Sequence, residues 1–227
     1  TGVFALAETF PHPGIQLSVA NLIEVMITES DNTTTDVSMD LAGGSAAVTE
    51  YLRRLGITDF RVDRTTREIL MDFYSLSAVT PEAIAEAISN NPALVMAQVN
   101  PNPDFEADPR DHATPLAMLQ LLLAIEAGTA MSPESRDFLL GVMSRTRTGP
   151  GRLKGLMPMG TLVAHKTGNA GGFAIDVGYI PLPDGRRFAI AVFTNSSETS
   201  MSDSDRAIAE IARMVFDYFY LAPVTKL

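Results

Sequence analysis

Apolar residues recur at helical spacing through the first two thirds of the chain. Residues 17–28 are apolar on nearly every side, which is typical of a central helix. Residues 100–104 predict an irregular loop, because each of their two prolines removes a backbone donor. From capping residues and apolar spacing we predict further helices over residues 33–41, 45–55, 66–74, 81–89, 94–99, 115–127 and 132–144.

The last third of the chain changes to the spacing of β-strands. We expect short strands over residues 161–165, 174–180 and 187–193, and an Asp-Gly pair marks a hairpin turn between the last two. Residues 203–220 carry one apolar stripe, as in a helix that covers one face of a sheet.

These patterns predict an α/β fold class of the α+β, two-lobed kind, with an antiparallel sheet covered by a C-terminal helix. We expect one domain over residues 1–227. Its helical lobe would span about residues 1–160, and its sheet and terminal helix about residues 161–227. This order suggests a cleft between the lobes.

Composition narrows the class of protein. With 46% hydrophobic and 19% charged residues among 227, the chain should be globular. Its 17 basic and 27 acidic residues give a net charge of −10, which repels phosphate backbones, so we expect no nucleic-acid partner. The absence of cysteine excludes thiolate nucleophiles and Cys-ligated zinc, and the three histidines lack metal-site spacing. The longest apolar run, over residues 116–125, is too short for a membrane span.

Two tripeptides could carry chemistry. Ser30-Asp31-Asn32 follows the first long apolar helix, and Lys166-Thr167-Gly168 stands at the end of a predicted strand. Taken singly, such tripeptides are most often a helix cap and a strand end. The chain has only three lysines, however, and burying Lys166 in an apolar strand is costly unless anions or acceptors surround it.

In this order the two motifs resemble the class A serine β-lactamases and the penicillin-binding proteins, whose signature is S-x-x-K, then S-D-N, then K-T-G. Residues 110–115 are similar to the family's R-D-T-T-T-P segment, and the final order of strands and helix is similar too. The resemblance covers essentially the whole chain, and residues 73–103 are its least familiar part. It implies a β-lactamase/transpeptidase-like fold and a serine hydrolase.

The resemblance also implies roles for the motif residues. Lys166 and Thr167 would bind the substrate carboxylate, Gly168 would belong to the substrate-binding residues, and Asn32 would contact the substrate's side-chain amide. Ser30, close to Lys166, would relay a proton to the leaving nitrogen as the lactam opens.

Two further positions follow from the same resemblance. Asn169 would give its backbone N–H to the oxyanion hole. Arg152 matches a position where some members place an extra guanidinium near the carboxylate, although a solvated loop arginine is an equal alternative.

Class A enzymes carry a loop with a glutamate that activates the deacylating water, closed at its neck by an Arg–Asp pair. By resemblance, Arg64 and Asp111 would form that pair, but they are 47 positions apart, which is several tens of residues longer than the usual loop. Thr66 stands where the glutamate is ordinarily found. Glu68 is the nearest carboxylate, either as the base or as a first-turn helix residue favoured by the helix dipole.

The nucleophile motif departs most from the family pattern. No serine or threonine of the chain has a lysine three residues later, so S-x-x-K is absent. In the family this motif lies several tens of residues before S-D-N, so we expect the nucleophilic serine upstream of Thr1, in an N-terminal segment that could accompany the chain as a separate piece. The chain alone would then expose apolar surface on its central helix and one sheet edge.

The resemblance implies no cofactor and no metal, a periplasmic or secreted location, and a β-lactam or peptidoglycan-peptide substrate. Two alternatives on the same scaffold stay open, a D-alanyl-D-alanine peptidase and a serine-dependent glutaminase. A non-catalytic fragment or degenerate relative is a third.

Overall fold

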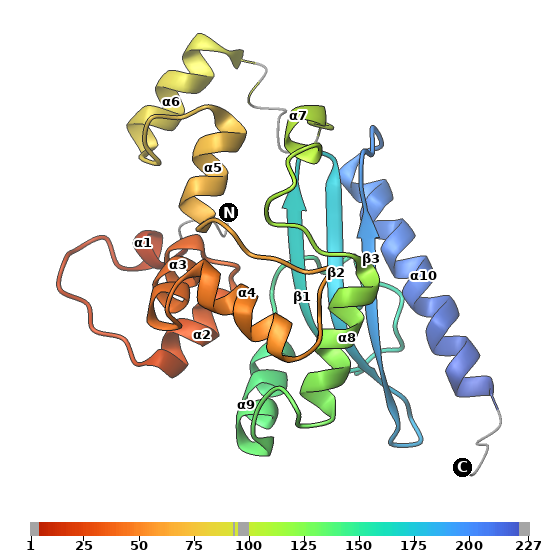
Figure 1. The fold of residues 1–227 in the computed structure, drawn as a ribbon. Helices are drawn as coiled ribbons and strands as arrows, with labels where there is room; N and C mark the ends of the chain where they lie inside the picture. Colours follow the sequence, from red (N-terminus) through yellow and green to blue (C-terminus); the bar gives the residue numbers. More distant parts are fainter. Residues whose placement is uncertain (1–4, 93, 95–99, 223–227) are drawn as a thin grey trace.

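The computed structural model describes residues 5–92, 94 and 100–222 of the chain (Figure 1). Its helices are α1 (Ala5–Thr9), α2 (Val19–Thr28), α3 (Asn32–Leu41), α4 (Ser45–Arg54), α5 (Thr66–Tyr74), α6 (Pro81–Asn90), α7 (Pro103–Glu106), α8 (Pro115–Glu126), α9 (Pro133–Met143) and α10 (Met201–Leu221). Its strands are β1 (Ala164–Ala170), β2 (Phe173–Pro181) and β3 (Arg187–Thr194). They form one antiparallel sheet in the order β1-β2-β3, so the predicted fold class is confirmed.

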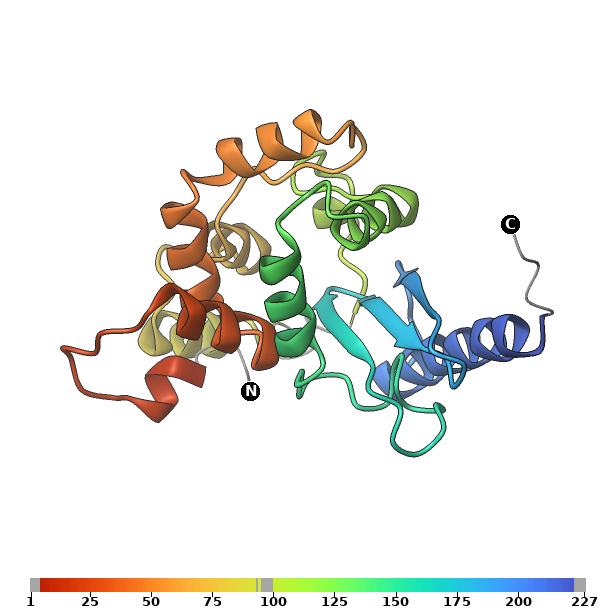
Figure 2. The same ribbon diagram turned by 90° about the horizontal axis from the view of Figure 1, so that it is seen from below.

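Side chains that alternate along the strands bury the two faces of the sheet separately. On one face Ile190 and Val192 pack against α10 through Ile208 and Phe216. On the other face, strand residues pack against α8 and α9; this cluster includes Leu122, Ile125, Met143, Val177 and Tyr179. The sheet thus lies between α10 and the pair α8 and α9 (Figures 1 and 2).

The predicted position of the first strand is wrong. We expected a strand over residues 161–165 that ended before Lys166, whereas β1 begins at Ala164 and runs through Ala170. Its pairing with β2 continues to Ala170 opposite Phe173. Backbone pairing therefore carries the polar K-T-G motif inside the strand, although its side chains lack the expected apolar alternation.

The helical part agrees with the expected pattern in some places and departs from it in others. The chain was expected to expose apolar surface on a helix over residues 17–28, and within the described chain only Leu22 and Thr28 of α2 are buried, while Val19 is 58% exposed. The loop predicted over residues 100–104 contains the start of α7, where Pro103 occupies the first helical turn that tolerates it. Short helix α1 was not predicted. The helix expected over residues 94–99 lies outside the described residues except for Leu94.

The long segment between the predicted neck residues Arg64 and Asp111 contains α5, α6 and α7. Helices α5 and α6 project from the helical part of the molecule, whereas α7 returns to the ends of β1 and β2 (Figure 1). Among the described residues, no helix combines the length and hydrophobicity needed to cross a membrane.

Candidate active site

In the S-D-N motif, Asp31 caps a helix and Ser30 contacts β1. Asp31 is fully buried and caps α3, because its Oδ1 accepts the Thr34 backbone N–H at 2.7 Å. Its Oδ2 accepts the Leu6 backbone N–H at 3.0 Å. Ser30 takes a left-handed backbone conformation with φ of 58°, uncommon for a residue other than glycine. The cap thus fixes the motif while Ser30 presents its hydroxyl to β1.

Lys166 meets Ser30 across the boundary between the helices and the sheet. Its Nζ donates to Ser30 Oγ at 2.6 Å and to the Thr167 carbonyl oxygen at 2.8 Å. Burial lowers the pKa of Lys166 to about 8; nearby Asp176 opposes this effect and Arg152 adds to it. Within the described chain, no carboxylate forms an ion pair with this ammonium. The Lys166 ammonium is therefore a largely desolvated cation with which an anionic ligand can form an ion pair.

Buried polar contacts hold β1 on both sides of Lys166 in the sequence. Thr167 Oγ1 lies 2.6 Å from Thr148 Oγ1, and the Thr146 hydroxyl donates to the His165 carbonyl oxygen at 2.6 Å. His165 Nδ1 lies 2.9 Å from both carboxylate oxygens of Asp176, and both side chains are fully buried. These contacts fix the strand that carries the K-T-G motif.

Arg152 is not a solvated loop arginine, because only 2% of it is exposed. Its Nη1 donates to the carbonyl oxygens of Gly168 and Ile175 at 3.1 and 2.9 Å, and its Nε donates to Asp205 at 2.6 Å. Its Nη2 contacts Asn169 Oδ1 and Met201 Sδ. All five guanidinium N–H groups are thus engaged, so none is free to contact a substrate carboxylate. In this arrangement Arg152 ties β1 to β2 and α10.

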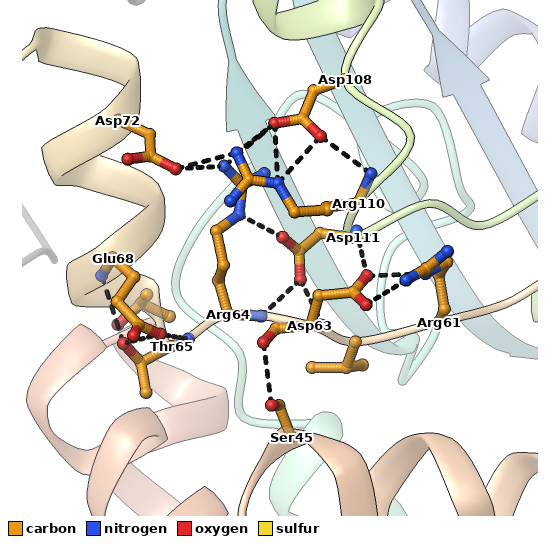
Figure 3. Close-up of polar contacts among 12 residues, drawn as sticks. Ser45, Arg61, Asp63, Arg64, Thr65, Glu68, Asp72, Asp108, Arg110 and Asp111 are labelled. Carbon is orange, nitrogen blue, oxygen red and sulfur yellow. Dashed lines mark hydrogen bonds and ion pairs between the residues drawn. The ribbon is translucent and has the colours of Figure 1, made fainter.

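The predicted neck residues meet within a larger ionic network, shown in Figure 3. Arg64 Nε donates to Asp111 Oδ2 at 2.6 Å, and Arg64 Nη1 lies 2.7 Å from Asp72 and 3.2 Å from Asp108. Arg110 bridges Asp72 and Asp108 as well. Only 6% of the Arg64 side chain is exposed; desolvation lowers its pKa, but the bonds to Asp111 and Asp72 raise it overall.

Backbone contacts reinforce the same neck. Asp111 Oδ1 accepts the backbone N–H groups of Asp63 and Arg64 at 2.7 and 3.0 Å, and Asp63 Oδ2 accepts the Asp111 N–H at 2.8 Å. Arg61 pairs with the Asp63 carboxylate, and this hydrogen bond holds the pKa of Asp63 below its usual value. The Asp63 and Asp111 carboxylates therefore hold the two ends of the long segment together, because they accept hydrogen bonds from both arginine side chains and backbone N–H groups.

Glu68 lies in the first turn of α5. Its Oε2 accepts the Thr65 backbone N–H at 2.8 Å, while Thr65 Oγ1 accepts the Glu68 N–H at 3.2 Å, which makes a capping box. Thr66 donates its N–H and its hydroxyl to Asp36 Oδ1, both at 2.7 Å. The described contacts of Glu68 are thus those of a helix-capping residue, and none joins it to Ser30 or Lys166.

The structure brings Ser30, Lys166, Thr167 and Gly168 into one connected group, with Asn169 joined to it through Arg152. Asn32 is linked to Thr66, whose hydroxyl donates to the Asn32 carbonyl oxygen at 3.1 Å. Sequence reasoning missed several partners, namely Asp36, Asp72, Asp108, Thr148, Asp176 and Asp205. Of these, only Asp108 stood beside a recognised motif; the others gave no local signal.

Comparisons with known proteins identify the family of the chain. The model of the beta-lactamase enzyme family matches residues 6–219. A beta-lactamase of Bacteroides uniformis is 32% identical over 220 residues, covering 93% of this chain and 64% of that protein. Beta-lactamase VEB-1 of Pseudomonas aeruginosa is 28% identical, covering 94% of this chain and 63% of its own length. The chain thus spans less than two thirds of these relatives.

Solved structures show the same fold. The TLA-3 extended-spectrum beta-lactamase superposes with a TM-score of 0.75 at 30% identity, covering 96% of this chain and 70% of that one. A representative class A beta-lactamase from Bacteroides cellulosilyticus also gives 0.75, at 28% identity with the same coverage. The chain therefore belongs to the beta-lactamase enzyme family, with relatives of class A.

Proposed function

We propose that this chain supplies the substrate-binding residues of a serine hydrolase that opens β-lactams through an acyl-enzyme. The observation that carries the proposal is the 2.6 Å contact between Lys166 Nζ and Ser30 Oγ, which joins the two tripeptides on which the resemblance rests. A carboxylate would supply the anion that Lys166 lacks within the described chain, in a site of low dielectric where a charge-assisted bond is strong.

The proposed reaction uses the other motif residues in turn. A serine hydroxyl adds to the lactam carbonyl and releases its proton, and the backbone N–H of Asn169 stabilises the oxyanion. The C–N bond breaks as Ser30 passes its proton to the nitrogen; Lys166 reprotonates Ser30, and the proton released by the nucleophile restores Lys166. Water then releases the acid and restores the serine. Thr167 would assist Lys166 in holding the carboxylate, and Asn32 would contact the side-chain amide.

We propose that the nucleophilic serine lies outside these 227 residues, because none of their serines or threonines precedes a lysine at the family spacing. The coverage of less than two thirds of the relatives supports this assignment. A periplasmic or secreted location fits a β-lactam substrate and is part of the same proposal.

One observation favours a second function, that of a penicillin-binding peptidase with slow deacylation. The position expected for the water-activating glutamate holds Thr66, whose hydroxyl and N–H donate to Asp36, and the nearest carboxylate in the sequence, Glu68, is engaged in the α5 cap. Without a base the acyl-enzyme would persist.

Intact-protein mass spectrometry separates these functions. The protein that carries this chain together with its serine is mixed with excess penicillin and sampled over time. A mass gain of one opened β-lactam that appears and then decays supports the hydrolase. A gain that persists supports the peptidase. The absence of any gain, with the free penicillin also left intact, contradicts both, because a fast hydrolase consumes penicillin without accumulating the adduct.

A further inference from the structure

A fully buried imidazole and carboxylate lie beside the K-T-G motif, and the proposed reaction gives neither of them a role. His165 precedes Lys166 on β1. Asp176 lies on β2, opposite Thr167 in the strand register. Both oxygens of the Asp176 carboxylate lie 2.9 Å from His165 Nδ1, and Oδ2 also accepts the Leu153 backbone N–H at 3.1 Å. Both side chains are 0% exposed.

The second ring nitrogen of His165 indicates the charge of this pair. Nε2 is buried and has no hydrogen-bond partner in the described part of the chain. A proton on Nε2 would leave a buried donor of a charged ring unsatisfied, which costs more than leaving a bare acceptor. The proton of a neutral imidazole therefore belongs on Nδ1, where it bonds the Asp176 carboxylate. Because the Leu153 N–H is a second donor to that carboxylate, its ionised form is favoured and the pair carries one negative charge.

A buried negative charge is costly unless a cation lies nearby. Arg152 is close, but its guanidinium already forms an ion pair with Asp205 of α10 at 2.6 Å. Lys166 has no carboxylate partner among the described residues, since its ammonium donates to Ser30 and to a backbone oxygen. Burial lowers the pKa of Lys166, Asp176 raises it against this effect, and Arg152 lowers it further. The Asp176 anion and the Lys166 cation therefore neutralise each other through the interior.

We infer that Asp176, held by His165, is a positioning residue whose carboxylate is the fixed counter-charge of the Lys166 ammonium. Its role in catalysis rests on the proposed function. Asp176 and Val177 point to opposite faces of β2, and Val177 is the residue opposite Lys166. The carboxylate thus supports the cation from the other face of the sheet and does not compete with a substrate anion for the ammonium. Two of the three N–H donors of Lys166 are engaged, which leaves one for that anion.

The charge of the pair is tested first, in the unaltered protein. ¹⁵N spectra distinguish protonated from bare nitrogens of imidazole rings, and this chain has only three histidines. The His165 signals are assigned by their loss in His165→Asn. From about pH 6 to 9, His165 should carry a proton on Nδ1 and none on Nε2. A ring protonated at both nitrogens over this range would make the pair neutral and overturn the counter-charge.

Titration of Lys166 tests the counter-charge without any substrate. The ¹³C signals of labelled lysine follow loss of the ammonium proton. Asp176→Asn keeps the shape of the side chain and should lower the pKa of Lys166 from about 8 by about one pH unit. Glu29→Gln is the matched control, because Glu29 precedes Ser30 in the sequence but pairs with the exposed Arg147 at 2.7 Å. Equal midpoints in the two variants would overturn the inference.

Acylation at two pH values links this charge to the reaction. The protein with its serine is treated with benzylpenicillin, and the second-order rate of acylation reports groups of the free protein. Asp176→Asn should be acylated about fivefold more slowly than the unaltered protein at about pH 8, where fewer Lys166 side chains keep their proton. At about pH 6 the two rates should agree within about twofold, because Lys166 is an ammonium in both. Glu29→Gln should change neither rate.

The outcomes separate the counter-charge, its role and the reaction. An equal loss of rate at both pH values would make Asp176 structural only and overturn its role in the reaction. If the unaltered protein is never acylated, the proposed function and the catalytic role both fail, while the ring spectra and the lysine titration still decide the counter-charge. If Asp176→Asn does not fold, the ring spectra of the unaltered protein still decide the charge of the pair.

Discussion

The loop neck and the Ser30–Lys166 junction each contain a buried cation, but only the cation at the neck is paired with carboxylates. At the neck, Arg64 meets three carboxylates, those of Asp72, Asp108 and Asp111. At the junction, Lys166 meets a hydroxyl and a carbonyl oxygen, and the described chain offers it no ion pair. The first arrangement stabilises a fold. The second leaves a charge that a ligand can neutralise, at some expense of stability.

The largest expected effect comes from removing that under-neutralised cation. Lys166→Met should slow acylation by a β-lactam about 10³-fold, because both the anion contact and the proton relay through Ser30 are lost. The free energy of unfolding should rise by up to about 2 kcal/mol, since an ammonium no longer has to be desolvated. Adduct formation and urea denaturation measure the two. Acylation within tenfold of the unaltered protein would remove Lys166 from the proposed mechanism.

Removing the buried cation at the neck should instead lower the stability of the protein. Arg64→Ala should lower the free energy of unfolding by about 3 kcal/mol, because it leaves Asp111 without its buried partner. Arg110→Ala is the control, because Arg110 contacts two of the same carboxylates, Asp72 and Asp108; its side chain is 45% exposed, so the loss should stay below about 1 kcal/mol. Equal losses in the two variants would show that burial does not distinguish them.

Ligand binding should also depend on pH at the junction. Because the pKa of Lys166 is lowered to about 8, the ammonium is present below that pH and is lost as the pH rises through it. Calorimetric affinity for a β-lactam carboxylate should therefore weaken about tenfold between about pH 7 and 9. A methyl ester of the same compound should show no such change. A pH-independent affinity for the acid would contradict the role of the ammonium.

The smallest effect is expected at Glu68. Glu68→Gln keeps an acceptor for the Thr65 N–H but loses the charge at the helix N-terminus, so stability should fall by about 0.5 kcal/mol. Deacylation, followed by loss of the adduct mass, should change less than about twofold. A drop of about 10²-fold would instead identify Glu68 as the base and show that its capping contact is not its main role.

Periodic features of the sequence predicted most of the fold. The helix predicted over residues 66–74 has the bounds of α5, and the strands around the Asp-Gly turn are correct within one residue. Strand β1 was misplaced because its buried face carries His165 and Thr167, whose polar side chains hide the alternation. Their partners come from Asp176 and Thr148, so the reason for their burial is visible only in three dimensions.

The candidate site was predictable only where short motifs carried it. Ser30 and Lys166 were found through their tripeptides, and Arg64 and Asp111 through the resemblance. The environment of Arg152 could not be predicted from the sequence, because its partners lie on β1, β2 and α10. The aromatic contacts of Phe105 were equally hidden, because its partners Phe73 and Phe173 lie on α5 and β2, far from it in the sequence.

The Ser30–Lys166 hydrogen bond has a consequence for the order of folding. It joins residues 136 positions apart, so closing it carries the entropy of a very long loop. Helices α2 and α3 and the β-meander form from nearer neighbours, and each can assemble before the other is in place. The Ser30–Lys166 contact, and with it the candidate site, should therefore form late in folding, after most of the secondary structure.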